Sequence, residues 1–173
     1  MSKALYKIST LLHQAKSSSF ALKKLNFFMR MGVPFNRPHR IVIRQVEDHS
    51  INCSIPYIKR NFNHLNGIHA CAMATVGEYC AGLCLLLSFK PELYRLIMKK
   101  IEVEYHFQGR QNLQSRCKIN PKDFDELSIQ LEQSDSSLQN MTTEIHDDDN
   151  NHVATVLTIW QVKPWSKVRL SSS

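Results

Sequence analysis

One carboxylate interrupts a small and apolar stretch in the middle of the chain. Glu78 lies within residues 69–89, where the other positions are mostly Ala, Val, Cys, Gly and Leu. A helix that is apolar on every face must be buried in a protein core or in a membrane. Burial of an unpaired carboxylate raises its pKa, and acids perturbed in this way gather at functional sites. Glu78 is therefore the first candidate for chemistry.

The segment before this stretch concentrates side chains that form hydrogen bonds. They are Asn61, Asn63, His64, Asn66 and His69, together with Gly67, which lets the backbone turn sharply. The first turn of the helix that follows offers free N–H groups and partial positive charge, which suit a developing oxyanion. We interpret the loop, the helix start and Glu78 as one candidate site.

Each of these residues also has a structural interpretation. Glu78 could pair with an arginine or lysine, as many buried acids do. Asn63 and Gly67 could shape a turn and cap the helix, and His64 could be an ordinary loop histidine.

A membrane span and a metal site are both disfavoured by residue type. Residues 69–89 approach the roughly 20 residues that cross a bilayer, but Glu78 lies near the centre and small residues replace leucine. Cys80 and Cys84 lie one helical turn apart, yet their Ala, Leu and Gly neighbours do not complete a zinc ligand set. We expect no transmembrane segment, no bound metal and no cysteine nucleophile.

Length and composition fit one globular domain with a full core: 173 residues, 43% of them hydrophobic and 21% charged. The net charge of +7 suits a partner that carries phosphates, such as coenzyme A, or an acidic carrier protein. No basic-plus-aromatic nucleic-acid motif is present, so we expect no nucleic acid partner. The odd number of cysteines and the lack of a secretory pattern predict a cytoplasmic location.

Hydrophobic periodicity predicts the order of the elements. Two helices are expected within residues 1–31, with a break at 16–19, and a buried helix over 69–89. Alternation predicts strands near 40–46, 50–57, 101–107, 113–119, 141–145 and 153–162, with a short helix or loop over 121–137. An antiparallel sheet must cover its apolar face, and the central helix is the one apolar enough. We predict an α+β fold with a curved six-stranded antiparallel sheet around that helix.

The expected domain boundaries follow from these elements. Residues 1–37 form an N-terminal helical arm and entry segment, 38–165 the main domain and 166–173 a disordered tail. The arm is expected to pack on the domain surface, and a membrane-surface or partner-binding role is the second possibility.

This arrangement and the loop sequence NFNHLNGIHACAMATVGE resemble the hotdog-fold acyl-CoA thioesterase superfamily. Its phenylacetate-type members carry roughly N-x-x-G-x-x-H-G-G, followed by an acid on the central helix. Asn63 and His69 keep the asparagine-to-histidine spacing, and Glu78 lies nine residues after the histidine, where several members carry a catalytic acid.

Two departures from this motif concern glycine. The motif glycine falls at Gly67 instead of at the position of Asn66, and the two glycines after the histidine are replaced by Ala70 and Cys71. Side chains there narrow the room for a thioester at the helix start.

The resemblance implies a hydrolase that cleaves an acyl-CoA or acyl-carrier thioester, with no cofactor besides the coenzyme A of the substrate. The N–H of Ala70 would stabilise the oxyanion while His69 lends orientation, and Asn63 would hold the water or the acyl carbonyl. Glu78 would act as general base or as nucleophile. A homodimer or homotetramer would complete the site across a subunit interface. The candidate substrate-binding residues are His64, Asn66, Gly67, Arg95 and Lys99.

Two alternatives stay open. His64 lies 14 residues before Glu78, a spacing that resembles the His/Glu pair of a fatty-acid dehydratase, so an acyl-thioester dehydratase or hydratase is possible. The replaced glycines instead favour a protein that binds acyl-CoA or an acyl carrier without turnover.

Overall fold

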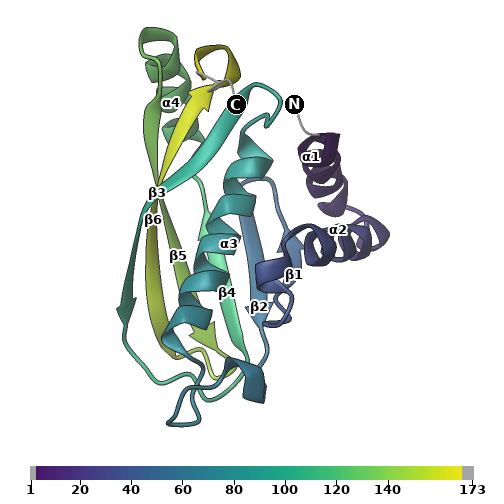
Figure 1. Cartoon of the computed structure of the whole chain (residues 1–173), viewed down its shortest axis with the longest axis vertical. Coiled ribbons are helices and arrows are strands. Elements are labelled where there is room, and N and C mark those ends of the chain that lie inside the picture. The colour runs from purple at the N-terminus through teal and green to yellow at the C-terminus, as the bar shows by residue number, and fades with distance from the viewer. Residues whose placement is uncertain (1–2, 169–173) are drawn as a thin grey trace, which may run out of the picture.

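The computed structural model describes residues 3–168 and contains two N-terminal helices followed by one curved sheet around a long helix (Figure 1). The helices are α1 (Lys3–Ala15), α2 (Ser19–Gly32), α3 (Ala70–Ser88) and α4 (Pro121–Gln133). The strands are β1 (Val42–Val46), β2 (Ser50–Ile55), β3 (Tyr94–Tyr105), β4 (Leu113–Lys118), β5 (Ser137–Asp147) and β6 (His152–Pro164). Their order is β1-β2-β4-β5-β6-β3, and all neighbours are antiparallel.

Helix α3 occupies the centre of the core, which confirms the predicted sheet around a buried helix. Within the described part of the chain it is the one helix long and apolar enough to cross a membrane, and 61% of its apolar window is buried in the fold. Gly77 brings α3 close to β6, because a Cβ there would lie 2.5 Å from Val156 Cγ2. The Thr143 hydroxyl of β5 donates to the Gly77 carbonyl at 3.1 Å. The apolar character of α3 is thus accounted for by packing.

The N-terminal arm packs against the β1 edge of the sheet and against α3 (Figure 1). Ala21, Leu25 and Met29 form the buried stripe of α2. The Asn26 side chain binds the backbone of Ile43 in β1 twice, donating to its carbonyl at 3.0 Å and accepting from its N–H at 2.8 Å. These bonds satisfy polar groups on an otherwise open strand edge.

Strand β3 differs from its prediction in length and surroundings. It begins at Tyr94, so Arg95 and Lys99, which the sequence analysis placed before the strand, lie within it. β3 pairs with β6 alone and is an edge strand, and a bulge between Met98 and Lys100 contains Lys99. Most of its side chains are exposed on both faces, so the strong alternation here does not mark a buried face within one chain.

At the C-terminal end, Trp165–Lys167 form a short 3-10 helix that spans the predicted boundary between the main domain, 38–165, and the tail, 166–173. Positions 169–173, which include most of that predicted tail, lie outside the described residues.

Candidate functional site

Glu78 lies in a pocket of about 480 Å³ between α3, the arm and the start of β3. The sheet covers the opposite face of α3, whereas Glu78 and Gly82 lie one turn apart on a face that is only half-buried. The lining is mostly apolar, and its other members are Leu5, Met29, Val33, Phe35, Asn36, Tyr79, Leu83, Leu86, Pro91, Tyr94, Arg95, Leu96, Trp160 and Trp165. The arm therefore forms one wall of the pocket that holds the candidate catalytic acid.

The Glu78 carboxylate has no partner among the described residues. None of the ion pairs and hydrogen bonds between described residues includes it. Arg95 lines the same pocket but makes no ion pair with Glu78, and its Nε is buried without a hydrogen-bond partner in the described part of the chain. Burial raises the pKa of Glu78, and no nearby cation opposes this shift. The ion-paired structural interpretation of Glu78 is therefore not what residues 3–168 show.

Gly82 keeps space open beside the carboxylate. A Cβ at this position would lie 3.2 Å from Trp160 Cη2 and 3.9 Å from Glu78 Oε1. A side chain here would fill part of the space beside the Glu78 carboxylate.

The loop before α3 is a tight turn held by Asn63. Its Oδ1 accepts from the N–H groups of Leu65 at 2.9 Å and Gly67 at 3.0 Å, and its own N–H donates to the Gly67 carbonyl at 2.8 Å. Asn66 adopts a left-handed backbone with φ of 59°. The turn-shaping interpretation of Asn63 and Gly67 is thus observed, and a second role for Asn63 would fall to its amide nitrogen.

His69 caps α3, with its Nδ1 accepting from the Cys71 N–H at 3.1 Å. The N–H of Ala70 has no hydrogen-bond partner among the described residues, so it is a free donor at the positive end of the helix. The Tyr105 hydroxyl of β3 donates to the Ala70 carbonyl at 3.1 Å and fixes this turn. Ala70 and Asn63 line a shallow pocket of about 400 Å³ with residues 105–109.

The structure does not bring all the candidate residues together within one chain. Ala70 and Glu78 lie eight positions apart, which is about 12 Å along a helix axis, and they line different pockets. His64 is exposed on the loop and lines neither pocket. Arg95 lines the Glu78 pocket, whereas Lys99 is exposed on the β3 bulge. The single site expected from the sequence is thus divided into an acid pocket, which contains Glu78, and a corner at the start of α3, which contains Asn63 and Ala70.

Several residues at the site were not chosen from the sequence. Asn61 was noted only as part of the polar loop, but it is buried, and its Nδ2 donates to the carbonyls of Pro56 at 2.9 Å and His39 at 3.1 Å. Tyr79 and Trp160 form walls of the acid pocket. The position of Gly82 could have been predicted, because it lies four residues after Glu78 and therefore on the same helix face. The contacts of Trp160 and Tyr105 could not, because they join segments that are distant in the sequence.

Metal-ligating side chains do not gather here. Within residues 3–168, no group of three or more His, Cys, Asp or Glu side chains is placed to hold a metal ion. All five cysteines are free thiols, and each except Cys71 is buried.

A curved antiparallel sheet wrapped around one helix defines the hotdog fold, and solved structures share it. A Pseudomonas aeruginosa protein of unknown function, described as a probable thioesterase, superposes with a TM-score of 0.76 at 15% identity, over 82% of this chain and 95% of that one. A thioesterase from Haemophilus influenzae gives 0.69 at 14% identity, over 91% and 99%. A mutant thioesterase from Pseudomonas aeruginosa gives 0.68 at 12% identity, over 87% and 99%. At these identities the likeness establishes the fold.

Residues 23–162 match the model of the family described as Domain of unknown function (DUF4442), and the chain belongs to that family. No curated protein sequence matches the chain.

Proposed function

We propose that this protein is a thioester hydrolase that acts on an acyl-CoA or acyl-carrier thioester through Glu78. The observation that carries the proposal is an unpaired carboxylate with a raised pKa in an apolar pocket of about 480 Å³. A pKa nearer to neutrality makes a carboxylate a better general base at physiological pH. The solved thioesterases with this fold support the same reaction class.

In the proposed reaction, Glu78 takes a proton from water as the oxygen adds to the thioester carbonyl carbon. The resulting oxyanion is stabilised by the free N–H of Ala70 in a second copy of the chain, and its collapse breaks the carbon–sulfur bond. The proton returns from Glu78 to the leaving thiolate, which gives a carboxylic acid and a thiol. Direct attack by the carboxylate, followed by hydrolysis of the anhydride, gives the same products.

We further propose that two copies of the chain form the working site. The free N–H of Ala70 and Glu78 are too far apart within one chain to act on one carbonyl. β3 is an edge strand whose exposed residues include Ile97, Met98 and Ile101, which suits pairing with a second β3. Such a dimer would cover the open face of α3 and bring the partner's loop toward Glu78.

A second candidate function is acyl-thioester binding without turnover. Ala70 and Cys71 carry side chains where the related motif has glycines, and they narrow the corner beside the free N–H. The position of His64 does not separate the dehydratase alternative from hydrolysis, because the loop that the dimer would bring toward Glu78 also contains His64.

The test is release of free thiol from acyl-CoA thioesters that range from acetyl to palmitoyl, with phenylacetyl and benzoyl included. Glu78→Gln keeps the size of the side chain but removes the base, so turnover is expected to fall roughly 100-fold or more. Glu144→Gln, an exposed change on β5, is the matched control and keeps full turnover.

Calorimetric titration with the same thioesters separates the two candidates. Binding without thiol release in the folded wild-type protein would replace the hydrolase with the binding function. Equal turnover in wild type and Glu78→Gln would remove Glu78 from the chemistry.

A further inference from the structure

The positive charge of this protein is concentrated at its N-terminal end. Nine of the 22 Lys and Arg residues lie in the first 46 positions, and the first acidic residue is Glu47. This segment carries +9 and the remainder −2, which together give the net +7. Seven of these nine residues lie in the arm, residues 1–37, and the other two, Arg40 and Arg44, lie in the segment that directly follows it. The arm and this adjoining segment are therefore the part that attracts an anionic partner.

Helix α2 is apolar on two faces, of which the fold covers one. Its inner stripe is the buried Ala21, Leu25 and Met29. Its outer stripe at i, i+7 and i+11 consists of Phe20, Phe27 and Met31, with exposed fractions of 65%, 63% and 56%. The sequence continues this outer stripe with Phe35, which is 71% exposed, after the helix ends.

Basic side chains flank the outer stripe on the same helix face. Lys24 lies between Phe20 and Phe27, and its ammonium is 4.4 Å from the Phe20 ring centroid. An amphipathic helix with large apolar side chains set among lysines and arginines is typical of a helix that lies in a membrane interface.

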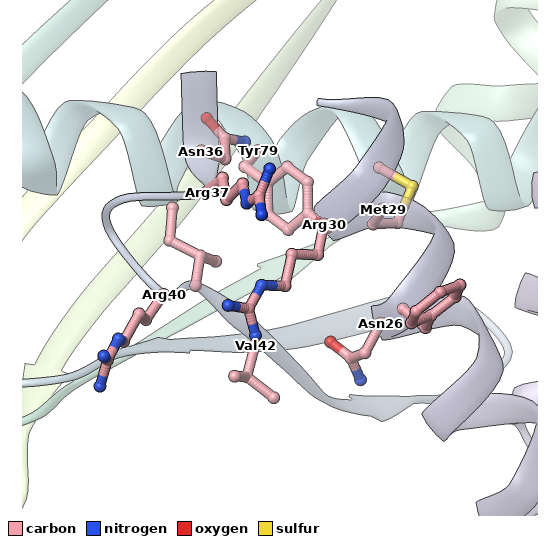
Figure 2. Close-up of a pocket in the computed structure, with 10 residues that line it drawn as sticks. Asn26, Met29, Arg30, Asn36, Arg37, Arg40, Val42 and Tyr79 are labelled. Carbon is pink, nitrogen blue, oxygen red and sulfur yellow. The ribbon is translucent and has the colours of Figure 1, made fainter. Parts of the chain in front are cut away.

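A pocket of about 450 Å³ lies directly beside this stripe, and Phe27 is one of its lining residues. It also contains Arg30 from α2 and Arg37 and Arg40 from the segment that leads into β1 (Figure 2). Figure 2 shows the Arg30 and Arg37 side chains among the other lining residues and the Arg40 guanidinium pointing away from them. None of the ion pairs among the described residues includes these arginines.

Two further features indicate that this pocket is shaped for a ligand. Arg40 has a left-handed backbone with φ of 53°, a costly conformation for a residue other than glycine, asparagine or aspartate. Tyr79 lines the pocket, is 8% exposed, and its hydroxyl has no hydrogen-bond partner in the described part of the chain. Guanidinium groups bind phosphate oxygens in a planar, two-point geometry.

We propose that the N-terminal arm binds the surface of an anionic phospholipid membrane. The outer stripe of α2 enters the boundary between headgroups and acyl chains, and the arginine pocket holds lipid phosphates. A second copy of the arm is a poor occupant, because two arms that each carry +7 over residues 1–37 repel one another. The same arm forms one wall of the Glu78 pocket, so a bound membrane lies next to that pocket.

The experiment is co-sedimentation of the full chain with vesicles of phosphatidylcholine alone or with 30% phosphatidylserine. Wild type is expected to bind the anionic vesicles at least tenfold more strongly, with binding weakened by salt. Phe20→Ser with Phe27→Ser, and separately Arg30→Gln with Arg37→Gln and Arg40→Gln, are each expected to lower this binding at least tenfold.

Two controls match these variants outside the arm. Ile129→Ser with Leu138→Ser removes two apolar side chains of similar exposure, 56% and 58%. Arg110→Gln with Lys118→Gln and Lys122→Gln removes the same charge as the arginine variant. Both controls are expected to bind vesicles within twofold of wild type, and circular dichroism checks that every variant is folded.

Each alternative occupant of the arm predicts a different experimental result. Equal binding of both vesicle types, or equal losses in variants and controls, would overturn it. Absent vesicle binding together with weaker acyl-CoA binding in the arginine variant would assign the pocket to a soluble phosphate ester instead. A change of oligomeric state in Phe20→Ser with Phe27→Ser, without vesicle binding, would assign the outer stripe to a second copy.

Discussion

Two faces of α3 use glycine for opposite purposes. On the face toward the sheet, an added Cβ at Gly77 would lie 2.5 Å from Val156 Cγ2, so this glycine lets helix and strand meet. On the face toward the pocket, an added Cβ at Gly82 would meet Trp160 at 3.2 Å and approach Glu78 Oε1 to 3.9 Å. Gly77 lets the helix and the strand pack closely, whereas Gly82 leaves room beside the Glu78 carboxylate. The face of α3 toward the sheet therefore contributes to stability, and the face toward the pocket offers space for chemistry.

The largest expected effect is on the packed face. Gly77→Ala forces a side chain into Val156, and such overpacking is expected to cost about 3 kcal/mol and to lower Tm by about 6–12 °C. Thermal unfolding measures the loss. Adding Val156→Ala makes room, so the double variant should lose less than the sum of the two single losses. Additive losses would mean that the contact between α3 and β6 is not what requires Gly77.

A smaller loss is expected where β5 holds the same face. Thr143→Val keeps the shape of the side chain but removes the donor to the Gly77 carbonyl, which should cost about 1 kcal/mol. Urea unfolding measures this cost, while turnover per folded molecule stays unchanged. A loss of turnover that exceeds the loss of stability would connect this face to the chemistry.

On the open face, Glu78→Gln is expected to stabilise the protein at neutral pH. Burial raises the pKa of Glu78, so the folded state binds the proton more tightly than the unfolded state does. The wild-type protein therefore loses stability as pH rises from the ordinary glutamate pKa, about 4.3, through the raised folded value. The extra stability of Glu78→Gln over wild type should be largest above the raised pKa of Glu78 and should vanish near pH 3. Urea midpoints between pH 3 and 8 test this, and an advantage that is independent of pH would contradict an unpaired Glu78.

The smallest effect on stability is expected at Gly82. Alanine is favoured over glycine in a helix by about 1 kcal/mol, and this gain offsets the close approach of the new Cβ to Trp160. The free energy of unfolding of Gly82→Ala should therefore stay within about 1 kcal/mol of the wild-type value. Its effect should appear instead in the substrate profile. KM for the bulkier acyl groups should rise several-fold while acetyl thioesters are spared. A uniform change across acyl lengths would place the acyl group outside this pocket.

Much of the fold was predictable because local periodicity encodes it. Apolar spacing located α1, α2 and α3, and alternation located all six strands. The prediction was wrong at the start of β3, where burial does not alternate: residues 94–96 are all half-buried and residues 97–100 are all exposed. The region over 121–137, left open as helix or loop, contains α4.

The site was only partly predictable. Glu78 stands out in sequence because a charge in an apolar helix is rare, and its raised pKa fits that signal. The catalytic roles of Asn63, His69 and Ala70 stay predictions. Tyr79 and Trp160 were missed, since aromatic residues in a core pattern look alike whether they pack or line a pocket.

The sequence by itself determined the apolar helix, its lone acid, the polar loop before it and the basic arm, because these are properties of composition and short-range spacing. Tertiary structure alone decided that Glu78 and the free N–H of Ala70 lie in different pockets, because the arm and the start of β3 line one pocket and residues 105–109 line the other. It also decided that the arm forms a wall of the Glu78 pocket while leaving Phe20 and Phe27 exposed. Which face of a helix is covered depends on contacts between segments distant in the chain, and no local pattern carries that information.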